Sequence, residues 1–408
     1  MVAAYNPSDR NDRNNWRAIL AAILLAKAAI ATFSIAPFLL GSYVDYIGLS
    51  TRQASQILSV EIFSIAIANV FAALFWIHKV RCRTWAIRLL LLLLVLNIVC
   101  IYAGNFSTLL ALRSAVGFTE GSLLGIGFGL LSASRRPDRS FGLMFAVSLT
   151  VGAANVRILP LYLETAGATG LFINLALYAI AALLCSQWIT RDRIVDTGPA
   201  SVTESKPARL VGKNAFPAMA LIFLLIANYV YFIGQGGVWS FLERWGLQQG
   251  LDLSGIATAL SLSLIGGVCG GLTAAWLDIR AGRLLPLSSA IILAIGSILL
   301  FRYTDSFIYF VIAAFVFNFV NNFGHPYILG LASSIDKSSR LTVLSGALHT
   351  GGQATGPFII GMLVTDTDFV NALWLGIGVF ALTWIILVPV MLVADRTVKR
   401  DPATADTA

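Results

Sequence analysis

The sequence contains few charged residues for its length. Only 12% of its 408 residues are Asp, Glu, Lys or Arg, whereas an ordinary soluble domain contains about 25%. Hydrophobic residues make up 58% of the chain, which is more than the core of a soluble protein requires. This composition excludes a soluble globular protein and indicates a chain that crosses a lipid bilayer many times.

Cysteines and catalytic motifs are also scarce. The four cysteines have neither the spacing of a disulfide framework nor that of a metal site. The chain lacks a Gly-rich phosphate loop ending in Gly-Lys-Ser or Gly-Lys-Thr, so we do not expect it to hydrolyse ATP. It also lacks His-Glu-x-x-His and Gly-x-Ser-x-Gly runs, which disfavours a polytopic membrane enzyme. We expect no enzymatic activity, no cofactor and no metal site.

Twelve apolar segments of about 20 residues follow one another along the chain, each long enough to cross a bilayer as a helix. They predict an all-α polytopic membrane protein. The densest polar run between spans, residues 191–214, resembles a solvated cytoplasmic linker. We therefore expect two pseudo-symmetric six-helix bundles, residues 17–190 and 215–394, with cytoplasmic tails at residues 1–16 and 395–408. The expected spans are residues 17–41, 53–77, 84–103, 107–134, 140–163, 167–190, 215–242, 254–277, 284–301, 306–335, 341–364 and 369–394.

Basic residues are distributed unevenly over the connecting segments. With the N-terminus inside, 21 of the 28 Lys and Arg residues lie on inner segments and only three on outer loops. By the positive-inside rule, both termini are expected in the cytoplasm of a multi-pass protein of the cell membrane. Topology thereby explains the pI of about 9.5, which gives no support to nucleic-acid binding.

Motifs recur in the two sets of spans. Trp76 and Trp276 stand at matching helix ends. Such duplication is common in secondary transporters, whose solute site lies at the midplane between two bundles. The inner loop after the eighth span carries Asp278, Arg280, Gly282 and Arg283, and the loop after the second span carries His78 where the aspartate would stand, followed by Lys79, Arg81 and Arg83.

These loops, the twelve spans and the central linker resemble the major facilitator superfamily. Its loop pattern is Gly, Asp four residues on, a basic residue, Gly and further basic residues. The fourth span is similar to its Leu-xxx-Arg-xx-Gln-Gly pattern from Leu109 to Gly117, with Val116 in place of Gln. The resemblance implies a fold of two six-helix bundles, a gating role for the loop residues, and first and fourth helices that face a common cavity.

Five charged residues lie deep in the first six spans: Lys27, Glu61, Arg113, Glu120 and Arg157. An ionised group near the bilayer centre costs roughly 2.5–3.5 kcal/mol, so each needs a partner or a wet cavity. Arg113 and Glu120 share a helix face seven residues apart, which is too far for direct contact. We expect Lys27 to be the partner of Glu120 and consider Glu120, Glu61, Lys27 and Arg113 candidates for proton coupling. Static ion pairs are the alternative, and Arg113 and Arg157 are also close enough to their outer ends to snorkel.

The second six spans carry polar rather than charged candidates. Asn318, Asn321, Asn322 and His325 have the i, i+3, i+4, i+7 spacing of one helix face. Asn228, Tyr231 and Gln235 share a face of the seventh span, before Gly236 and Gly237, where that helix could bend or break. We expect these residues to line a cavity; ordinary hydrogen bonds between helices are the alternative. The candidates for the cavity are thus Lys27, Arg113, Glu120, Arg157, Asn228, Tyr231, Gln235, Asn318, Asn322 and His325.

Together these features favour a monomeric secondary transporter that moves a small organic solute by alternating access, coupled to protons. The deep charges sum to +1, from Lys27, Arg113 and Arg157 against the two glutamates, which favours an organic anion such as a carboxylate. A proton-driven exporter of amphipathic compounds is the alternative. The Gly-Pro antiporter pattern of the resembled superfamily is absent from the fifth span, which argues against that alternative. A transporter-like sensor that binds the solute without moving it also remains open.

Overall fold

The computed structural model describes residues 16–76, 79–134, 136–189, 218–277, 280, 282–303, 306–335, 340–365 and 369–399. These residues form helices and their connections, and none of them lies in a β-strand. The chain divides into two compact units, Met1–Asp196 and Thr197–Ala408, at a boundary inside the polar run of residues 191–214. The loop residues His78 and Asp278 lie outside the described residues.

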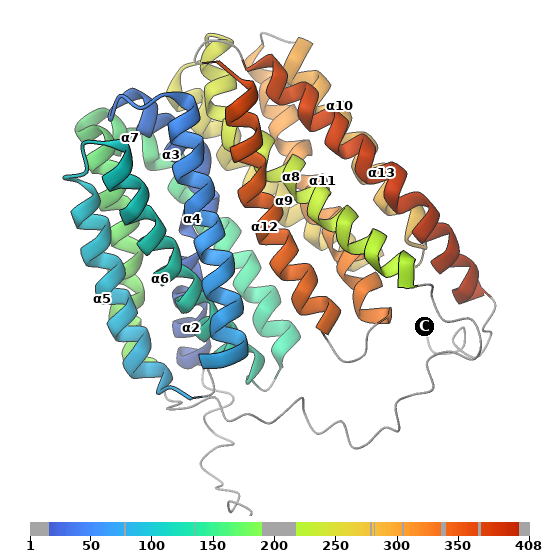
Figure 1. Ribbon diagram of the computed structural model, residues 1–408, viewed down its shortest axis with the longest axis horizontal. Coiled ribbons are helices and arrows are strands. Elements are labelled where there is room, and N and C mark those ends of the chain that lie inside the picture. The colour runs from blue at the N-terminus through green and yellow to red at the C-terminus, as the bar shows by residue number, and fades with distance from the viewer. Residues whose placement is uncertain are drawn as a thin grey trace, which may run out of the picture. The chain divides into compact units, whose positions relative to one another are not determined.

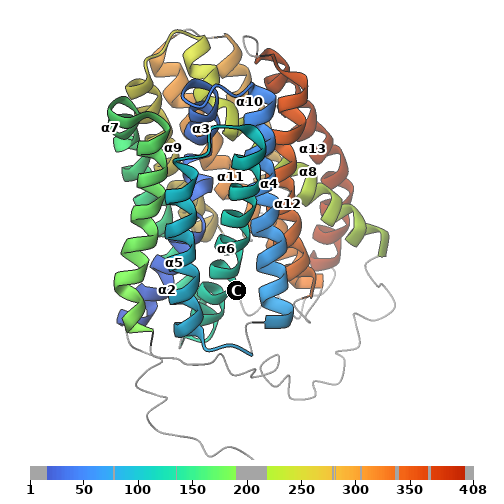
Figure 2. The same ribbon diagram turned by 60° about the vertical axis from the view of Figure 1, so that its left-hand side comes forward.

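Unit 1 is a bundle of long helices that run alongside one another (Figure 1). A short π-helix, Ala72–Trp76, extends α4. Helix α4 packs along α6, and the two helices lie side by side in the turned view as well (Figure 2). The helices are α2 (Trp16–Ala29), α3 (Ala31–Asp45), α4 (Thr51–Phe71), α5 (Cys82–Cys100), α6 (Phe106–Ser132) and α7 (Pro137–Cys185).

Unit 2 is a second helical bundle. Its closest helix pairs are α9 with α11 and α8 with α12. The helices are α8 (Ala218–Gln248), α9 (Leu253–Leu277), α10 (Leu284–Tyr303), α11 (Phe307–Ile335), α12 (Arg340–Leu363) and α13 (Val370–Lys399).

Within the described ranges, ten helical segments are long and apolar enough to cross a membrane. One of them, Arg139–Trp188, has 50 residues, about twice the length that a crossing needs. Gly167 turns the chain inside it with φ 55° and ψ −138°, a conformation open to glycine because it has no Cβ. This segment therefore contains two crossings. Together with α12, which is 24 residues long, the twelve predicted crossings are all present.

The first span was expected to be one continuous helix, and it is broken instead. Helix α2 ends at Ala29 and α3 begins at Ala31, because Ile30 adopts φ −119° and ψ 13°, outside the helical region. The break puts Lys27 in the last turn of α2 and Thr32 in the first turn of α3. In the seventh span, which could bend or break at Gly236 and Gly237, α8 is one continuous helix.

Glycines bring the paired helices into close contact. A Cβ on Gly117 of α6 would overlap the backbone carbonyl of Glu61 on α4, and one on Gly121 would overlap that of Ile65. Small residues at such positions let two backbones approach closely. The close contact at Gly117 places Glu61 at the same depth in the bundle as Arg113 and Glu120 of α6. In unit 2, Gly236 and Gly356 do the same between α8 and α12.

We expect the change Gly117→Ala to destabilise unit 1, because the added methyl group would force α4 and α6 apart. Overpacking of this kind costs typically about 1–3 kcal/mol. A lower melting temperature of the purified chain in detergent is the expected result. Gly142→Ala is the matched control, since a Cβ there meets no atom within 4 Å. Equal melting temperatures for the two variants would contradict this account of the packing.

Candidate functional site

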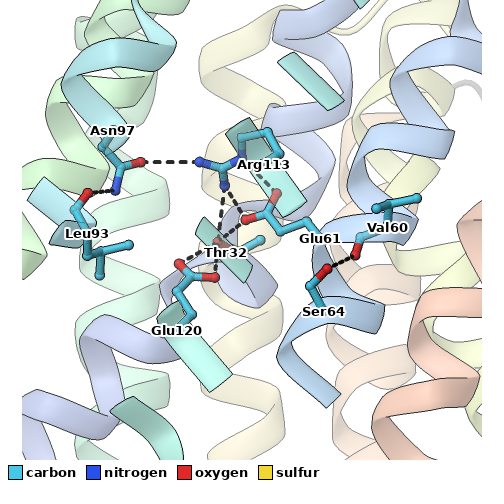
Figure 3. Close-up of polar contacts among 8 residues, drawn as sticks. All are labelled: Thr32, Val60, Glu61, Ser64, Leu93, Asn97, Arg113 and Glu120. Carbon is cyan, nitrogen blue, oxygen red and sulfur yellow. Dashed lines mark hydrogen bonds and ion pairs between the residues drawn. The ribbon is translucent and has the colours of Figure 1, made fainter. Parts of the chain in front are cut away.

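Charged and polar side chains from four helices meet inside unit 1 (Figure 3). The break at Ile30 places Thr32 at the start of α3. Glu61 comes from α4, Asn97 from α5, and Arg113 and Glu120 from α6. Each of the five is almost completely buried. We call Thr32, Glu61, Asn97, Arg113 and Glu120 the polar network.

Arg113 and Glu61 form a buried ion pair with two contacts. Arg113 Nε donates to Glu61 Oε2 at 2.8 Å, and Arg113 Nη2 donates to Glu61 Oε1. The remaining terminal nitrogen, Nη1, donates to Asn97 Oδ1 at 3.2 Å. Asn97 is held in place because its Nδ2 donates to the Leu93 carbonyl at 2.9 Å. The planar guanidinium suits a carboxylate bound through both oxygens. Arg113 therefore does not snorkel to the membrane surface.

Glu120 is joined to the network through a single hydroxyl group. Thr32 Oγ1 lies 3.1 Å from Glu120 Oε1 and 2.9 Å from Glu61 Oε1. Arg113 Nη2 also approaches Thr32 Oγ1, at 3.5 Å. Among the described residues no guanidinium or ammonium group contacts Glu120, which confirms that Arg113 and Glu120 are not direct partners. Two carboxyl groups thus face one guanidinium, and one threonine connects them.

The predicted pairing of Lys27 with Glu120 is wrong. Lys27 Nζ donates to Ser34 Oγ at 3.0 Å and lies 5.4 Å from the centre of the Tyr178 ring. Thr32 and Ser34 are two residues apart on α3, so they point to nearly opposite sides of that helix. Thr32 faces the glutamates, whereas Ser34 and Lys27 face α7. Two side chains from the same broken span are therefore directed to different sites.

Lys27 is an ammonium group without a carboxylate partner among the described residues, and its side chain is only 1% exposed. A cation in the last turn of a helix gains roughly 0.3–1 kcal/mol from the helix dipole. Removing a charge from water costs several kcal/mol per ion, even after relaxation. The position of Lys27 at the end of α2 therefore does not by itself account for its burial.

A cavity of about 360 Å³ opens where α3 joins α4 and α5 joins α6. Tyr46, Cys100 and Gly167 are among the residues that line it. Cys100 is the last residue of α5, the helix that also supplies Asn97 to the polar network. The cavity therefore lies at the end of a helix that contributes to this network.

The other predicted residue of unit 1, Arg157, lies apart from the polar network on an exposed part of α7. In the loops, Lys79 and Arg280 are exposed and Arg283 is half-buried. Gly282 has φ 71°, in the left-handed region that favours glycine. The described side chains of this predicted loop motif, Lys79, Arg280 and Arg283, are therefore not part of the polar network.

Most predicted residues of unit 2 make hydrogen bonds between or within helices. His325 instead belongs to an aromatic cluster, in which its ring meets that of His349 edge-on at 4.6 Å, and His349 stacks on Phe232 at 3.7 Å. The predicted stripe on α11 thus packs largely against α9 and its own helix. The contacts are Asn228 Nδ2 to Ser345 O at 2.8 Å, Tyr231 Oη to Val320 O at 3.5 Å, Gln353 Nε2 to Gln235 Oε1 at 2.8 Å, Asn318 Nδ2 to Ser263 Oγ at 3.0 Å, Asn321 Nδ2 to Phe317 O at 2.8 Å and Asn322 Nδ2 to Asn318 O at 3.0 Å.

Several site residues were not predicted from the sequence. Thr32 and Asn97 are common helix residues whose spacing gives no signal, and only the packing of helices brings them to the charges. Outside this site, Glu243 and Arg244 were placed beyond the seventh span, but α8 continues to Gln248 and buries both. If the predicted seventh span had been extended across residues 239–247, it would have included both residues.

We expect Arg113→Met to destabilise unit 1 strongly, because it leaves the Glu61 carboxylate buried without a cation. Removing one partner of a buried ion pair costs about 3–5 kcal/mol. In the double variant with Glu61→Gln no unpaired charge remains, so part of the loss should be recovered. Thermal unfolding in detergent measures both. If the single and double variants melt alike, the pair does not have this energetic role.

Comparisons with known proteins place the chain in a family. The family model described as Major Facilitator Superfamily matches residues 21–354. No curated protein sequence matches the chain.

Solved transporter structures share its fold. The nucleoside transporter NupG, crystallised as a point mutant, is 12% identical with a TM-score of 0.73, covering 91% of this chain and 99% of that one. A POT family transporter in complex with 5-aminolevulinic acid is 14% identical with a TM-score of 0.72, covering 91% and 95%. A bacterial homolog of the human lysosomal transporter Spinster, inward-facing and unoccupied, is 15% identical with a TM-score of 0.61, covering 97% and 98%.

At these identities the structural matches show the fold alone, two six-helix bundles. The family match covers most of the sequence and agrees with that fold. Together they make the chain an integral, multi-pass membrane protein and a transporter rather than an enzyme. The chain belongs to the Major Facilitator Superfamily.

Proposed function

We propose that this secondary transporter moves a small organic anion together with protons, by alternating access, and that Glu120 carries the coupled proton. We further propose that it acts as a monomer in the cell membrane with both termini in the cytoplasm. The observation that carries the proton proposal is the single hydroxyl shared by two buried carboxyl groups.

The hydrogen-bond arrangement supports a protonated Glu120. A threonine hydroxyl has one proton to donate and two lone pairs to accept with. If Thr32 donates to Glu61, an ionised Glu120 has no donor left, although a buried carboxylate requires one. A protonated Glu120 instead donates to Thr32 Oγ1, which donates to Glu61, which in turn accepts from Arg113. Every group is then satisfied, and the only ionised groups are one anion and one cation.

Loss of that proton would upset this balance. Two carboxylates would then share one guanidinium and one hydroxyl inside a dry bundle, where an unpaired charge is expensive. Among the described residues, the other titratable side chains close enough to act on Arg113 and Glu61 are Tyr43 of α3 and Cys100 of α5, and neither supplies a positive charge. Deprotonation therefore favours any conformation that brings water or a cation to Glu120. When two conformations differ in their affinity for the proton on Glu120, binding or release of that proton shifts the equilibrium between them.

The charges also favour an anionic solute. Arg113 and Glu61 cancel each other, and a protonated Glu120 is neutral. Among the described residues of unit 1, this leaves Lys27 as the buried basic group without an acidic partner. Two solved structures with a similar fold are a nucleoside transporter and a POT family transporter in complex with 5-aminolevulinic acid. Solute flux in proteoliposomes distinguishes this proposal from export of amphipathic compounds and from a sensor, which moves no solute.

We expect Glu120→Gln to abolish accumulation driven by a pH gradient, because glutamine cannot release a proton. Its amide can still donate to Thr32, so the variant should fold with a melting temperature close to that of the wild type. Solute exchange without a gradient should continue. Proteoliposomes loaded with a panel of organic acids measure both activities. Undiminished pH-driven accumulation in this variant would exclude Glu120 as the coupling group.

Removal of the Thr32 hydroxyl should have a related effect. We expect Thr32→Val to slow pH-driven uptake roughly tenfold or more, since hydrogen bonds to charged groups are worth about 1.5–3 kcal/mol, and Thr32→Ser to restore it. Thr119→Val is the matched control, because the Thr119 hydroxyl donates only to the Ala115 carbonyl of its own helix, at 2.8 Å. If valine at position 32 leaves the pH profile of uptake unchanged, the hydroxyl does not link the two glutamates.

A further inference from the structure

We propose that the exposed face of α5 binds an anionic phospholipid, whose phosphate group is held by Arg81 and Arg88 beside Trp85. This partner is separate from the transported solute, so the inference does not depend on the proposed function. A single stripe of side chains along α5 changes from cations and tryptophan at one end to exposed aliphatic groups along the rest. A phospholipid has a charged head and apolar chains in the same order.

Helix α5 leaves one of its faces uncovered. Of the ten described segments that could cross a membrane, Cys82–Cys100 has the smallest buried share, and α5 lies at the edge of unit 1 (Figure 1). Its packed face is formed by residues that recur every three or four positions. They are Cys82, Ala86, Leu90, Leu93, Asn97 and Cys100. The exposed residues on the other side of the helix therefore meet lipid in a membrane.

The exposed stripe begins with charge and continues with aliphatic side chains. Its members are separated alternately by four and three residues, and residues at such intervals share one side of a helix. They are Arg81, Trp85, Arg88, Leu92, Val95 and Val99. The last three are 46%, 54% and 41% exposed. A ligand that lies along this stripe would therefore contact cations at one end and apolar groups over the rest of its length.

Two tryptophans shape the charged end of the stripe. Trp85 meets Trp76 of the π-helix edge-on, with ring centroids 4.9 Å apart. Arg88 folds back over the Trp85 ring, with its Cζ 5.3 Å from the ring centroid. Its guanidinium is thereby directed toward the start of α5, where Arg81 lies. Tryptophan is enriched at the headgroup level of membranes, so the two rings lie at the depth of a lipid phosphate.

The cations at this end lack acidic partners. Lys79, Arg81 and Arg88 are exposed, and no ion pair engages any of them in the described part of the chain. Lys79 belongs to the same surroundings, because its backbone N–H donates to the Trp76 carbonyl at 3.0 Å. Cations near an anionic membrane surface are attracted to it. A second copy of the chain placed symmetrically on this face would instead bring like charges together.

The two parts of the stripe together select a phospholipid. A free phosphate ion would meet the cations but leave the aliphatic residues uncovered, and an uncharged lipid would do the opposite. The planar guanidinium of Arg81 or Arg88 suits phosphate oxygens, which it can bind through two N–H groups. Phosphatidylglycerol carries one negative charge at its phosphate. Phosphatidylcholine fits less well, because its choline group adds a positive charge close to the arginines.

The test compares two lipids with the same acyl chains on the purified full chain in detergent. Dioleoyl phosphatidylglycerol and dioleoyl phosphatidylcholine are titrated, and native mass spectrometry measures the bound lipid. We expect phosphatidylglycerol to bind about tenfold more tightly, with a smaller preference at high salt because salt screens exposed charges. Glycerol phosphate, the head without its chains, should not displace the lipid. Equal binding of the two lipids, or displacement by glycerol phosphate, would overturn the inference.

Variants locate the bound lipid. The double variant Arg81→Gln, Arg88→Gln should lose the preference for phosphatidylglycerol, because both phosphate-binding cations are gone. Arg157→Gln is the matched control, since it removes an exposed arginine from a different helix, α7. If the double variant keeps the full preference, the site is wrongly assigned. If it does not fold, Arg88→Gln decides alone, and the preference should then fall in part.

The same spectra report the other possible occupant of this face. We expect the lipid-free chain to be monomeric. A dimer that Val95→Asn separates would assign the face to a second copy of the chain and contradict lipid binding there. None of these measurements requires transport. A failure of the proton or solute proposal would therefore leave the lipid result unchanged, and loss of lipid binding would leave both of those proposals standing.

Discussion

Burial of charge in an apolar bundle is the constraint on which the architecture of unit 1 depends. Arg113 and Glu61 form an ion pair with two contacts, and Asn97 accepts a hydrogen bond from another N–H group of the guanidinium. Glu120 adds a second acid without adding a base, and Thr32 is its only link to the pair. Burial of both acids in the ionised form beside one guanidinium would be costly. The stability of unit 1 therefore depends on how these charged groups are paired.

Two features of the backbone make this arrangement possible. Gly117 removes the side chain that would hold α4 and α6 apart, so Glu61 can reach Arg113. The break at Ile30 ends α2 after Lys27 and starts α3 before Thr32. The same span thereby presents a hydroxyl to the acids and, on its other side, a cation to α7. One broken helix thus serves two chemically different surroundings.

Unit 2 repeats the close packing at glycines but has no counterpart of the polar network among its described residues. Gly236 and Gly356 bring α8 against α12, much as glycine does between α4 and α6. Its polar residues, such as Asn318, mostly make hydrogen bonds that hold helices together. The sequence-based expectation was that the polar residues of α11 line a cavity, with hydrogen bonds between helices as the alternative. Hydrogen bonds engage Asn318 and Asn321 through their amide nitrogens, whereas Asn321 Oδ1 and His325 Nε2 have no hydrogen-bond partner in the described part of the chain. Polarity and depth alone therefore do not distinguish the two roles.

The amino-acid sequence by itself determined the membrane setting, the twelve crossings, the division into two halves and four of the five expected deep charges, all but Arg157. These follow from hydropathy, helix length and the cost of burying charge, which are local properties of the chain. The sequence could not assign partners: Lys27 was paired with Glu120, whereas Glu61 holds Arg113 and Thr32 holds Glu120. Partners depend on the rotation of each helix about its axis and on where a helix breaks. Only the packing of the helices decides those, because residues from distant spans meet through it.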